Sequence, residues 1–447
     1  MPELMLKRLG WATAGYGIVQ AIRFGSNLVL TRILAPDLFG VMILLTTLRV
    51  GIELFTDIGI AQNVVSSKNA EDPRFYNTAW TLQILRGILL ALLTFVLVPV
   101  FRSYYDDPRL SFVLPFMAAF FILTGGTSIG LPLAVKRLAT HRTATFEVVS
   151  TLLGTVALIL SSWLSPDILG LVIGNVLASC MPTILSYFIL RDLRYSPMID
   201  RTYAFEIIGF GKWVFVSSVV FFLSSNLDRL VLAKYVSFAA LGVYGIARSL
   251  ADVFASFSVK LGSELVFPSV AASDARGAEL QRRLAHRRGQ FVFASAAAIG
   301  SFVAVSDVLV SFLYDSRYHG AAVLLPWVCL SAWMMILNTL NENVMLGLGA
   351  PKFSAFGSVA KLAGLLVLLP LALQSYGIVA AGAALVAAEC LRYACLSIGQ
   401  ARHGIGFARQ DVLATLILLG TAFVLRAAMF QAGLGAPAHQ LFLMHRL

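Results

Sequence analysis

Residues 78–101 form the run TAWTLQILRGILLALLTFVLVPVF, in which Arg86 is the one charged side chain. A helix that crosses the hydrocarbon core of a bilayer needs about 20 predominantly apolar residues, and shorter apolar runs are typical of buried helices in soluble proteins. The length and composition of this run therefore predict a transmembrane helix.

The composition of the whole chain supports the same interpretation. Of its 447 residues, 58% are hydrophobic and 13% are charged, whereas a soluble domain is about a quarter charged. A single aqueous core cannot hide so much apolar surface. Lys7 and Arg8 precede the first hydrophobic run, and no short run with a small-residue cleavage site follows them. We therefore expect a retained first helix and not a removed signal peptide.

Hydrophobic runs separated by polar joints recur along the chain. By the length criterion they predict about thirteen spans, the last of which is interrupted by Arg426. The expected spans cover residues 10–33, 38–65, 78–101, 111–135, 145–164, 168–190, 211–235, 239–266, 290–314, 321–348, 353–374, 376–399 and 410–431. We expect an all-α polytopic membrane protein.

Lysine and arginine are distributed unevenly over the joints. One alternating set of joints is basic: Lys7, Arg8, Lys68, Arg74, Lys136, Arg137, Arg142, Arg191, Arg194, Arg201, Lys212, Arg276, Arg282, Arg283, Arg287, Arg288, Lys352, Arg402 and Arg409. The other set is poorer in basic residues and holds acids: Asp37, Asp106, Asp107, Asp167 and Asp315. Cytoplasmic joints are enriched in lysine and arginine, so we place the N-terminus in the cytoplasm and attribute most of the net charge of +11 to this bias. The basic residues lie at helix ends, and this position disfavours a nucleic-acid-binding surface. For residues 281–288 two interpretations stay open, a solvated loop and a segment that binds anionic lipid.

The two halves of the chain resemble each other at an offset of 202 residues. The offset aligns Trp11 with Trp213, residues 28–30 with 230–232, Arg32 with Lys234, residues 40–41 with 242–243, and Leu48 with Leu250. Chance similarity between hydrophobic helices is the alternative. Six expected spans separate the two starts, so the repeat is parallel and predicts two six-helix lobes related by a pseudo-two-fold axis along the membrane normal. We expect an N-lobe at 1–190, a cytoplasmic linker at 191–210, a C-lobe at 211–400, and one further helix with a tail at 401–447.

Charged residues at membrane depth are costly and suggest function by default. Arg49, Glu53 and Asp57 follow one face of the second span, and Arg248 and Asp252 have the same spacing in the eighth. The repeat offset maps Arg248 to position 46, one helical turn from Arg49. Two interpretations stay open: ion pairs at i,i+4 within each lobe, or a cationic cavity for a phosphorylated ligand, whose oxygens match a guanidinium group.

Other intramembrane polar residues allow two interpretations each. Arg23 lies on a polar face of the first span and adds to the cationic set. Arg86 either extends towards the interface or lines the cavity. Asp228 and Arg229 lie toward the outer end of the seventh span and suggest a gate. Asn341 and Glu342 are either hydrogen-bonding groups between helices or cavity-lining residues.

The sequence lacks the common signatures of enzymes and metal sites. It contains no P-loop, no HExxH and no G-x-S-x-G motif. The joints between spans are too short for an ATPase or glycosyltransferase domain. We therefore predict no catalytic residues, no metal and no cofactor, with energy from a Na⁺ or H⁺ gradient or the membrane potential.

Several of these segments resemble a known family. Residues 30–40, LTRILAPDLFG, and the later TDIG at 56–59 with Gln62 are similar to the polysaccharide transporter (oligosaccharide-lipid flippase) family. This family belongs to the multidrug/oligosaccharidyl-lipid/polysaccharide exporter superfamily. The segments NLDR at 226–229 and LGVYGIA at 241–247 resemble its second-lobe counterpart. The resemblance covers roughly residues 5–400, and the thirteenth span departs from the usual twelve or fourteen.

The resemblance implies a two-lobed, V-shaped helix bundle that flips undecaprenyl-diphosphate-linked oligosaccharide to the outer face of a bacterial inner membrane. Such a flippase would serve surface polysaccharide, lipopolysaccharide or exopolysaccharide synthesis. It implies cavity arginines at Arg23, Arg49 and Arg248. From their position within the spans, Arg86 and Asn341 are further candidates for substrate binding. The candidates for ion coupling or gating are Glu53, Asp57, Asp252, Glu342, Asp228 and Arg229. The expected partners are the lipid-linked glycan, membrane lipid and polysaccharide polymerases.

Three other functions compete with the flippase. A drug/cation antiporter of the same superfamily would need a net negative cavity, which the arginines disfavour. A membrane polymerase or ligase of the same pathway would need a sizeable outer loop, and none is visible in the sequence. A scaffold that does not transport would leave vesicles containing only this protein without translocation.

Overall fold

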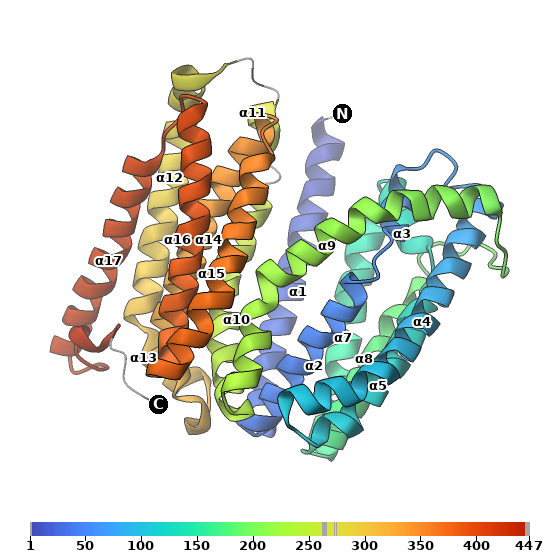
Figure 1. Cartoon of the computed structure of the whole chain (residues 1–447), viewed down its shortest axis with the longest axis horizontal. Helices are drawn as coiled ribbons and strands as arrows, with labels where there is room; N and C mark the ends of the chain where they lie inside the picture. Colours follow the sequence, from blue (N-terminus) through green and yellow to red (C-terminus); the bar gives the residue numbers. More distant parts are fainter. Residues whose placement is uncertain (1, 262–265, 272, 274, 443–447) are drawn as a thin grey trace. The chain divides into compact units, whose positions relative to one another are not determined.

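The computed structural model describes residues 2–261, 266–271, 273 and 275–442, and these form helices joined by short turns (Figure 1). The chain divides into two compact units, Met1–Phe222 and Leu223–Leu447. The side chains of Lys7, Arg8, Lys212 and Trp213, on which part of the expected topology and repeat depends, lie outside the described part.

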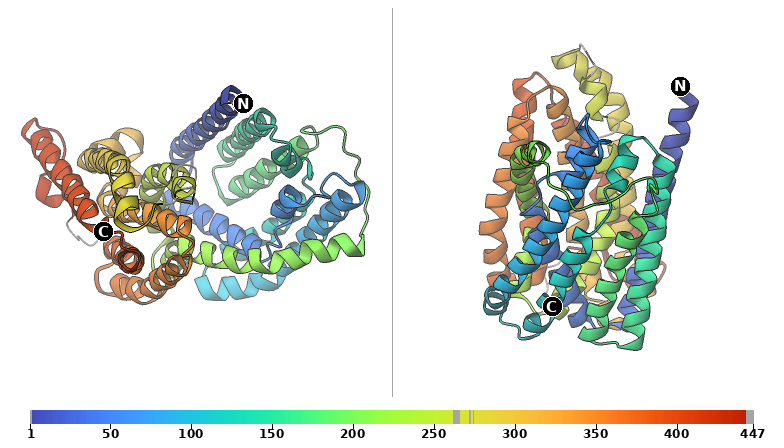
Figure 2. Two further views of the ribbon diagram at one scale, coloured as in Figure 1. Left: turned by 90° about the horizontal axis from the view of Figure 1, so that it is seen from above. Right: turned by 90° about the vertical axis from the view of Figure 1, so that its right-hand side faces the viewer.

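The first unit is a row of long helices completed by two short ones (Figures 1 and 2). Its helix α7 contacts α1 and α8, while α5 contacts α8 and α4. The elements are α1 (Pro2–Ile33), α2 (Pro36–Leu54), α3 (Ile60–Ser66), α4 (Pro73–Tyr105), α5 (Arg109–Gly125), α6 (Gly130–Lys136), α7 (Thr140–Leu164), α8 (Ile168–Ser186) and the first part of α9 (Arg201–Tyr235).

Local sequence determines where several of these helices begin. Proline occupies the start of α2 and α4, where its missing N–H leaves no helical bond unmade. The Asp72 carboxylate accepts a hydrogen bond from the Arg74 amide at 2.8 Å, and Asp167 accepts one from the Gly170 amide at 2.9 Å. Both aspartates therefore satisfy amides that have no partner within the first helical turn.

The segment between α8 and α9 is bound to the side of α4. The amides of Ser196, Met198 and Asp200 donate to the side chains of Asn77, Thr81 and Thr78, each at 3.0 Å. Alternate residues of an extended chain face the same side, which explains the regular spacing of the three donors. Much of the expected linker at 191–210 is therefore held on the first unit, and α9 begins within it.

The second unit surrounds a central helix, α14 (Figures 1 and 2). In its most apolar stretch of 18 residues, 72% of the residues are buried inside the protein, against 17–50% for the other candidate membrane spans. It contacts α10, α12 and α16, and α17 packs on α12. The elements after α9 are α10 (Phe238–Leu261), α11 (Phe267–Ala271), α12 (Gly277–Ala304), α13 (Ser306–Leu313), α14 (Ala321–Gly347), α15 (Lys352–Tyr376), α16 (Ile378–Arg402) and α17 (Ala408–Gln431).

Thirteen spans were expected, and most coincide with helices of sufficient length. Among the described residues, eight helices are long and apolar enough to cross a membrane, and two bent pairs, α5 with α6 and α12 with α13, raise the number to ten. The eight include α17, so the uncertain thirteenth span is one of them. The other three expected spans coincide with α1, α9 and the pair α2 and α3. In the pair α2 and α3, the expected helix at 38–65 is interrupted, because α2 ends at Leu54 and Gly59 adopts a left-handed conformation with φ 64°.

Candidate functional site

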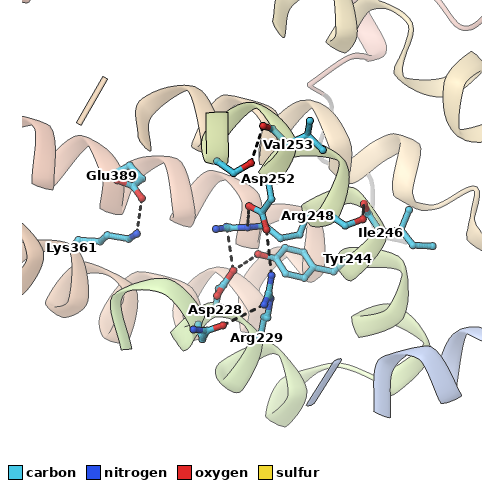
Figure 3. A network of polar contacts seen from close by, with 12 residues as sticks. Asp228, Arg229, Tyr244, Ile246, Arg248, Asp252, Val253, Lys361 and Glu389 are labelled. Carbon is cyan, nitrogen blue, oxygen red and sulfur yellow. Dashed lines mark hydrogen bonds and ion pairs between the residues drawn. The ribbon is translucent and has the colours of Figure 1, made fainter. Parts of the chain in front are cut away.

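Helices α9 and α10 bring four charged residues and one tyrosine together in the second unit (Figure 3). The Arg248 Nε atom lies 2.9 Å from Asp252 Oδ1, and its Nη1 atom lies 3.4 Å from Asp228 Oδ2. Arg229 reaches Asp252 at 3.4 Å, and the Tyr244 hydroxyl donates to Asp228. Tyr244, Arg248 and Asp252 succeed one another at intervals of four residues, so one face of α10 presents all three.

This cluster contains two arginines and two carboxylates, so its charges balance. Of the two interpretations left open for these residues, the ion pair at i,i+4 between Arg248 and Asp252 is formed. The Asp228 side chain is 4% exposed and that of Asp252 is 37% exposed. Asp228 is thus the buried counter-ion of Arg248, and Asp252 is the counter-ion that other molecules can reach.

A second ion pair, between α15 and α16, lies close to this cluster (Figure 3). Lys361 Nζ is 2.6 Å from Glu389 Oε1, and Asn338 of α14 donates to Glu389 Oε2 at 2.8 Å. A cavity of about 10 Å³ is lined by Asp228 and Arg248 on the one hand and by Lys361 and Glu389 on the other. The shared cavity makes the two ion-pair groups one continuous polar region within the second unit.

Two predicted residues of α14 belong to other contacts of the second unit. Glu342 accepts from Arg392 at 2.6 Å and from the Ser354 hydroxyl. Asn341 is fully buried and accepts a 2.9 Å hydrogen bond from Arg288. In this structure Asn341 therefore orients a buried arginine, and Glu342 joins α14 to α15 and α16.

The partner of Arg288 was not predicted from the sequence. This arginine was counted among the basic residues of a loop, but it lies in α12 and binds Asp411 of α17, with Nη1–Oδ1 at 2.6 Å. Both side chains are buried, and Tyr393 also donates to Asp411 at 2.8 Å. The available signal was a single acid, Asp411, at the start of an otherwise apolar run.

Arg49 has a different environment in the first unit. Its guanidinium carbon lies 4.2 Å from the centre of the Phe120 ring, and its Nε atom is buried with no hydrogen-bond partner. It lines a cavity of about 50 Å³ that is otherwise largely apolar and includes Asn175. Within the described part of the chain no carboxylate lies within ion-pair distance of Arg49, so the expected pair with Glu53 is not formed.

The other predicted residues of the first unit lie near the end of α2 or on α1. Arg86 donates to the Glu53 carbonyl at 2.5 Å and to the Thr56 hydroxyl at 3.3 Å, so it binds the last turn of α2. Asp57 accepts from the Gly59 amide at 2.9 Å and stabilises the turn before α3. Arg23 is exposed on α1. Its convergence with Arg49 and with Arg248 of the second unit stays a prediction.

Comparison with known proteins places the chain in a family. Residues 29–346 match the profile of a family described as polysaccharide biosynthesis protein. The chain belongs to this family. The predicted polysaccharide family is thereby confirmed, and with its candidate spans the chain is a multi-pass membrane protein.

Curated relatives are distant members of the same group. The chain is 22% identical over 298 residues to the teichuronic acid biosynthesis protein TuaB of Bacillus subtilis (strain 168), covering 66% of this chain and 62% of that protein. It is 22% identical over 263 residues to the lipopolysaccharide biosynthesis protein WzxC of Escherichia coli (strain K12), covering 58% and 53%. It is 20% identical over 255 residues to the succinoglycan biosynthesis transport protein ExoT of Rhizobium meliloti (strain 1021), covering 56% and 50%. The chain thus spans about half to three fifths of the length of these relatives.

Solved structures show the fold. The lipid II flippase MurJ, in an inward closed conformation, matches with a TM-score of 0.73 at 10% identity, covering 96% of this chain and 94% of that one. A multidrug resistance MATE family transporter in an inward-facing conformation matches with a TM-score of 0.62 at 12% identity, covering 91% and 98%. The predicted all-α, two-lobed fold is confirmed.

Proposed function

We propose that this protein is a flippase that moves a prenyl-diphosphate-linked oligosaccharide across a bacterial inner membrane by alternating access. The glycan would serve surface polysaccharide or exopolysaccharide synthesis. Family membership supports this function, as do relatives that are named for the biosynthesis or transport of three different polysaccharides.

The single observation that carries the proposal is the environment of the Arg49 side chain. Its guanidinium group lies in a largely apolar cavity, its Nε atom has no hydrogen-bond partner, and no carboxylate of the described residues lies within ion-pair distance. Removing a cation from water is expensive unless an anion or a polar network compensates for it. A diphosphate offers pairs of oxygens that the planar guanidinium group of an arginine can bind with two parallel hydrogen bonds. We assign the first diphosphate contact to Arg49.

Arg248 would bind the diphosphate by exchanging one counter-ion for another. Asp252 is the exposed partner of Arg248, whereas Asp228 is buried and also bound by Tyr244. An incoming phosphate therefore competes with Asp252 and leaves Asp228 in place. In this proposal Arg23 contributes further positive charge, and Glu53, Asp57, Glu342, Asp228 and Arg229 stay candidates for coupling or gating. A Na⁺ or H⁺ gradient supplies the energy.

Reconstitution of the full chain in vesicles tests the proposal. Vesicles that contain a fluorescent prenyl-diphosphate oligosaccharide should show protein-dependent movement of the headgroup between leaflets. The Arg49→Ala variant should lose about 10- to 100-fold in initial rate, which corresponds to one charge-assisted hydrogen-bonding group, and Arg49→Lys should retain part of the rate. Arg102→Ala removes the same charge at an exposed helix end and serves as the control.

The same vesicles distinguish the competing functions. Transport of a lipophilic cation without movement of the labelled lipid would identify an antiporter instead. Wild-type movement of the labelled lipid in the Arg49→Ala variant would exclude the assigned diphosphate contact. Absence of any protein-dependent movement with several prenyl-linked glycans would exclude the flippase itself.

A further inference from the structure

A hollow of about 690 Å³ lies at one end of α7 and α8 in the first unit. Helix α7 begins at Thr140 and α8 ends at Ser186, and both are candidate membrane spans. The hollow therefore lies where the two spans leave the hydrocarbon core. The polar lining residues lie at or beyond the helix ends: His141, Arg142, Arg191 and Asp192. The apolar lining residues lie further along the spans or beside them: Phe146, Val149, Leu185 and Phe188.

The acids near the hollow are already bound to one arginine. Arg137 reaches Glu71 at 2.9 Å and Asp192 at 3.2 Å. The Asp192 backbone amide and the Arg137 side chain hold the pKa of Asp192 below its ordinary value, so this acid is ionised and paired. Over the described residues, Arg142 and Arg191 have no carboxylate within ion-pair distance. Counted together, Arg137, Arg142 and Arg191 exceed Glu71 and Asp192 by one positive charge.

Arg142 and Arg191 are positioned beside apolar groups. Arg142 donates to the Ile189 carbonyl at 3.4 Å, and the Arg191 guanidinium carbon lies 5.7 Å from the centre of the Phe188 ring. Phe188 is 58% exposed and Val149 is 37% exposed. A small anion would contact the arginines and leave these two side chains uncovered. A molecule with an anionic head and an apolar chain would satisfy both parts.

We propose that this hollow is a binding site for an anionic phospholipid, distinct from the proposed diphosphate site at Arg49. The phosphate binds between Arg142 and Arg191, and the acyl chains cover Val149, Leu185 and Phe188. Basic pockets between membrane helices are suited to anionic headgroups. The site fixes one lipid at the joint between α7 and α8, and it does not depend on translocation of any substrate.

Thermal unfolding of the purified full chain in detergent, with added lipid, tests the site. Phosphatidylglycerol should raise the unfolding temperature more than phosphatidylcholine does. The Arg142→Gln/Arg191→Gln variant should lose this difference, with lipid affinity about fivefold weaker for each arginine removed. Arg402→Gln/Arg409→Gln removes the same charge from the exposed basic joint between α16 and α17 and should behave like the wild type.

Each remaining outcome decides for or against the site. Equal loss in the Arg402→Gln/Arg409→Gln variant would indicate a general surface-charge effect and overturn the proposal. Full stabilisation by glycerol 3-phosphate would indicate a site for a free anion, and stabilisation by a prenyl diphosphate alone would indicate a substrate site; both overturn it. If the double variant does not fold, Arg191→Gln replaces it, because Arg191 is exposed and its one described side-chain contact is the Phe188 ring. Unchanged phosphatidylglycerol dependence in that single variant would equally overturn the proposal.

Discussion

Arg288 of α12 and Asp411 of α17 form a buried ion pair across 123 positions of the sequence, with 2.6 Å between Nη1 and Oδ1. Asn341 and Tyr393 complete the pair by hydrogen bonds from α14 and α16. Four helices of the second unit are therefore joined at one point by charged and polar groups.

Breaking this pair should destabilise the protein strongly. Asp411→Ala leaves the Arg288 guanidinium buried without its counter-ion, which costs about 3–5 kcal/mol. Arg288→Met/Asp411→Leu should cost less than the sum of the two single changes, because it removes both charges together. Chemical denaturation in detergent measures the free energy of unfolding. Arg283→Ala breaks an exposed pair with Glu279 and should change it by less than about 1 kcal/mol. Similar effects of Asp411→Ala and Arg283→Ala would contradict the structural role.

The positions of most helices could be predicted because a membrane imposes a length and a composition on each span. Within the part of the chain that the structure describes, ten of the thirteen expected spans meet that criterion as single helices or bent pairs. The interruption between α2 and α3 could not be predicted from hydropathy. It depends on Gly59, which adopts φ 64°, and on the Asp57 carboxylate that binds the Gly59 amide.

The charged residues of the candidate site could be located, but only some of their partners could be. The same i,i+4 spacing gives an ion pair in Arg248–Asp252 and none in Arg49–Glu53. Arg49 stacks instead on Phe120, which comes from α5. Partners on distant helices depend on packing that residue spacing does not specify. The buried pairs Lys361–Glu389 and Arg288–Asp411 are of this kind.

Packing of α4 on α5 should be sensitive to one methyl group. A Cβ atom at Gly87 would lie 2.6 Å from the Phe121 carbonyl oxygen and 2.9 Å from Gly125 Cα. Both are backbone atoms, so the helices would have to separate. We expect Gly87→Ala to destabilise the protein by about 1–3 kcal/mol.

A matched substitution controls for the change in helix propensity. Gly420 of α17 has open space around the corresponding position, so Gly420→Ala should be neutral or stabilising by up to about 1 kcal/mol. Thermal unfolding of both variants in one detergent compares them. Equal behaviour of Gly87→Ala and Gly420→Ala would show that α4 and α5 do not approach as closely as described.

The segment before α9 should lose protection when α4 loses its acceptors. Thr78→Val/Thr81→Val removes the hydroxyls that accept from Asp200 and Met198. Each such bond contributes about 0.5–1.5 kcal/mol, so the amide hydrogens of residues 196–200 should exchange several-fold faster. Hydrogen-exchange mass spectrometry measures this. Thr94→Val is the control, because Thr94 bonds to Leu90 of its own helix. Unchanged exchange at 196–200 would contradict the attachment to α4.

Asp228 and Asp252 should respond differently to removal of their charge. Asp228→Asn weakens the counter-ion of Arg248 in a buried position and changes the contact with Tyr244, so we expect a loss of stability of several kcal/mol. Asp252 is more exposed, so Asp252→Asn should be tolerated and should leave Arg248 more available to an external anion.

Binding of inorganic pyrophosphate to the purified protein separates these two effects. If phosphate displaces Asp252 from Arg248, then Asp252→Asn should tighten pyrophosphate binding by about tenfold, since one competing charge-assisted contact is removed. Translocation of the labelled lipid should then become slower at saturating substrate, because a more tightly held diphosphate leaves more slowly. Asp107→Asn removes an acid from a joint in the first unit, where Asp107 pairs with Arg109, and should leave pyrophosphate affinity unchanged. Weaker pyrophosphate binding in Asp252→Asn would mean that this carboxylate supports anion binding, and the exchange of counter-ions at Arg248 would have to be abandoned.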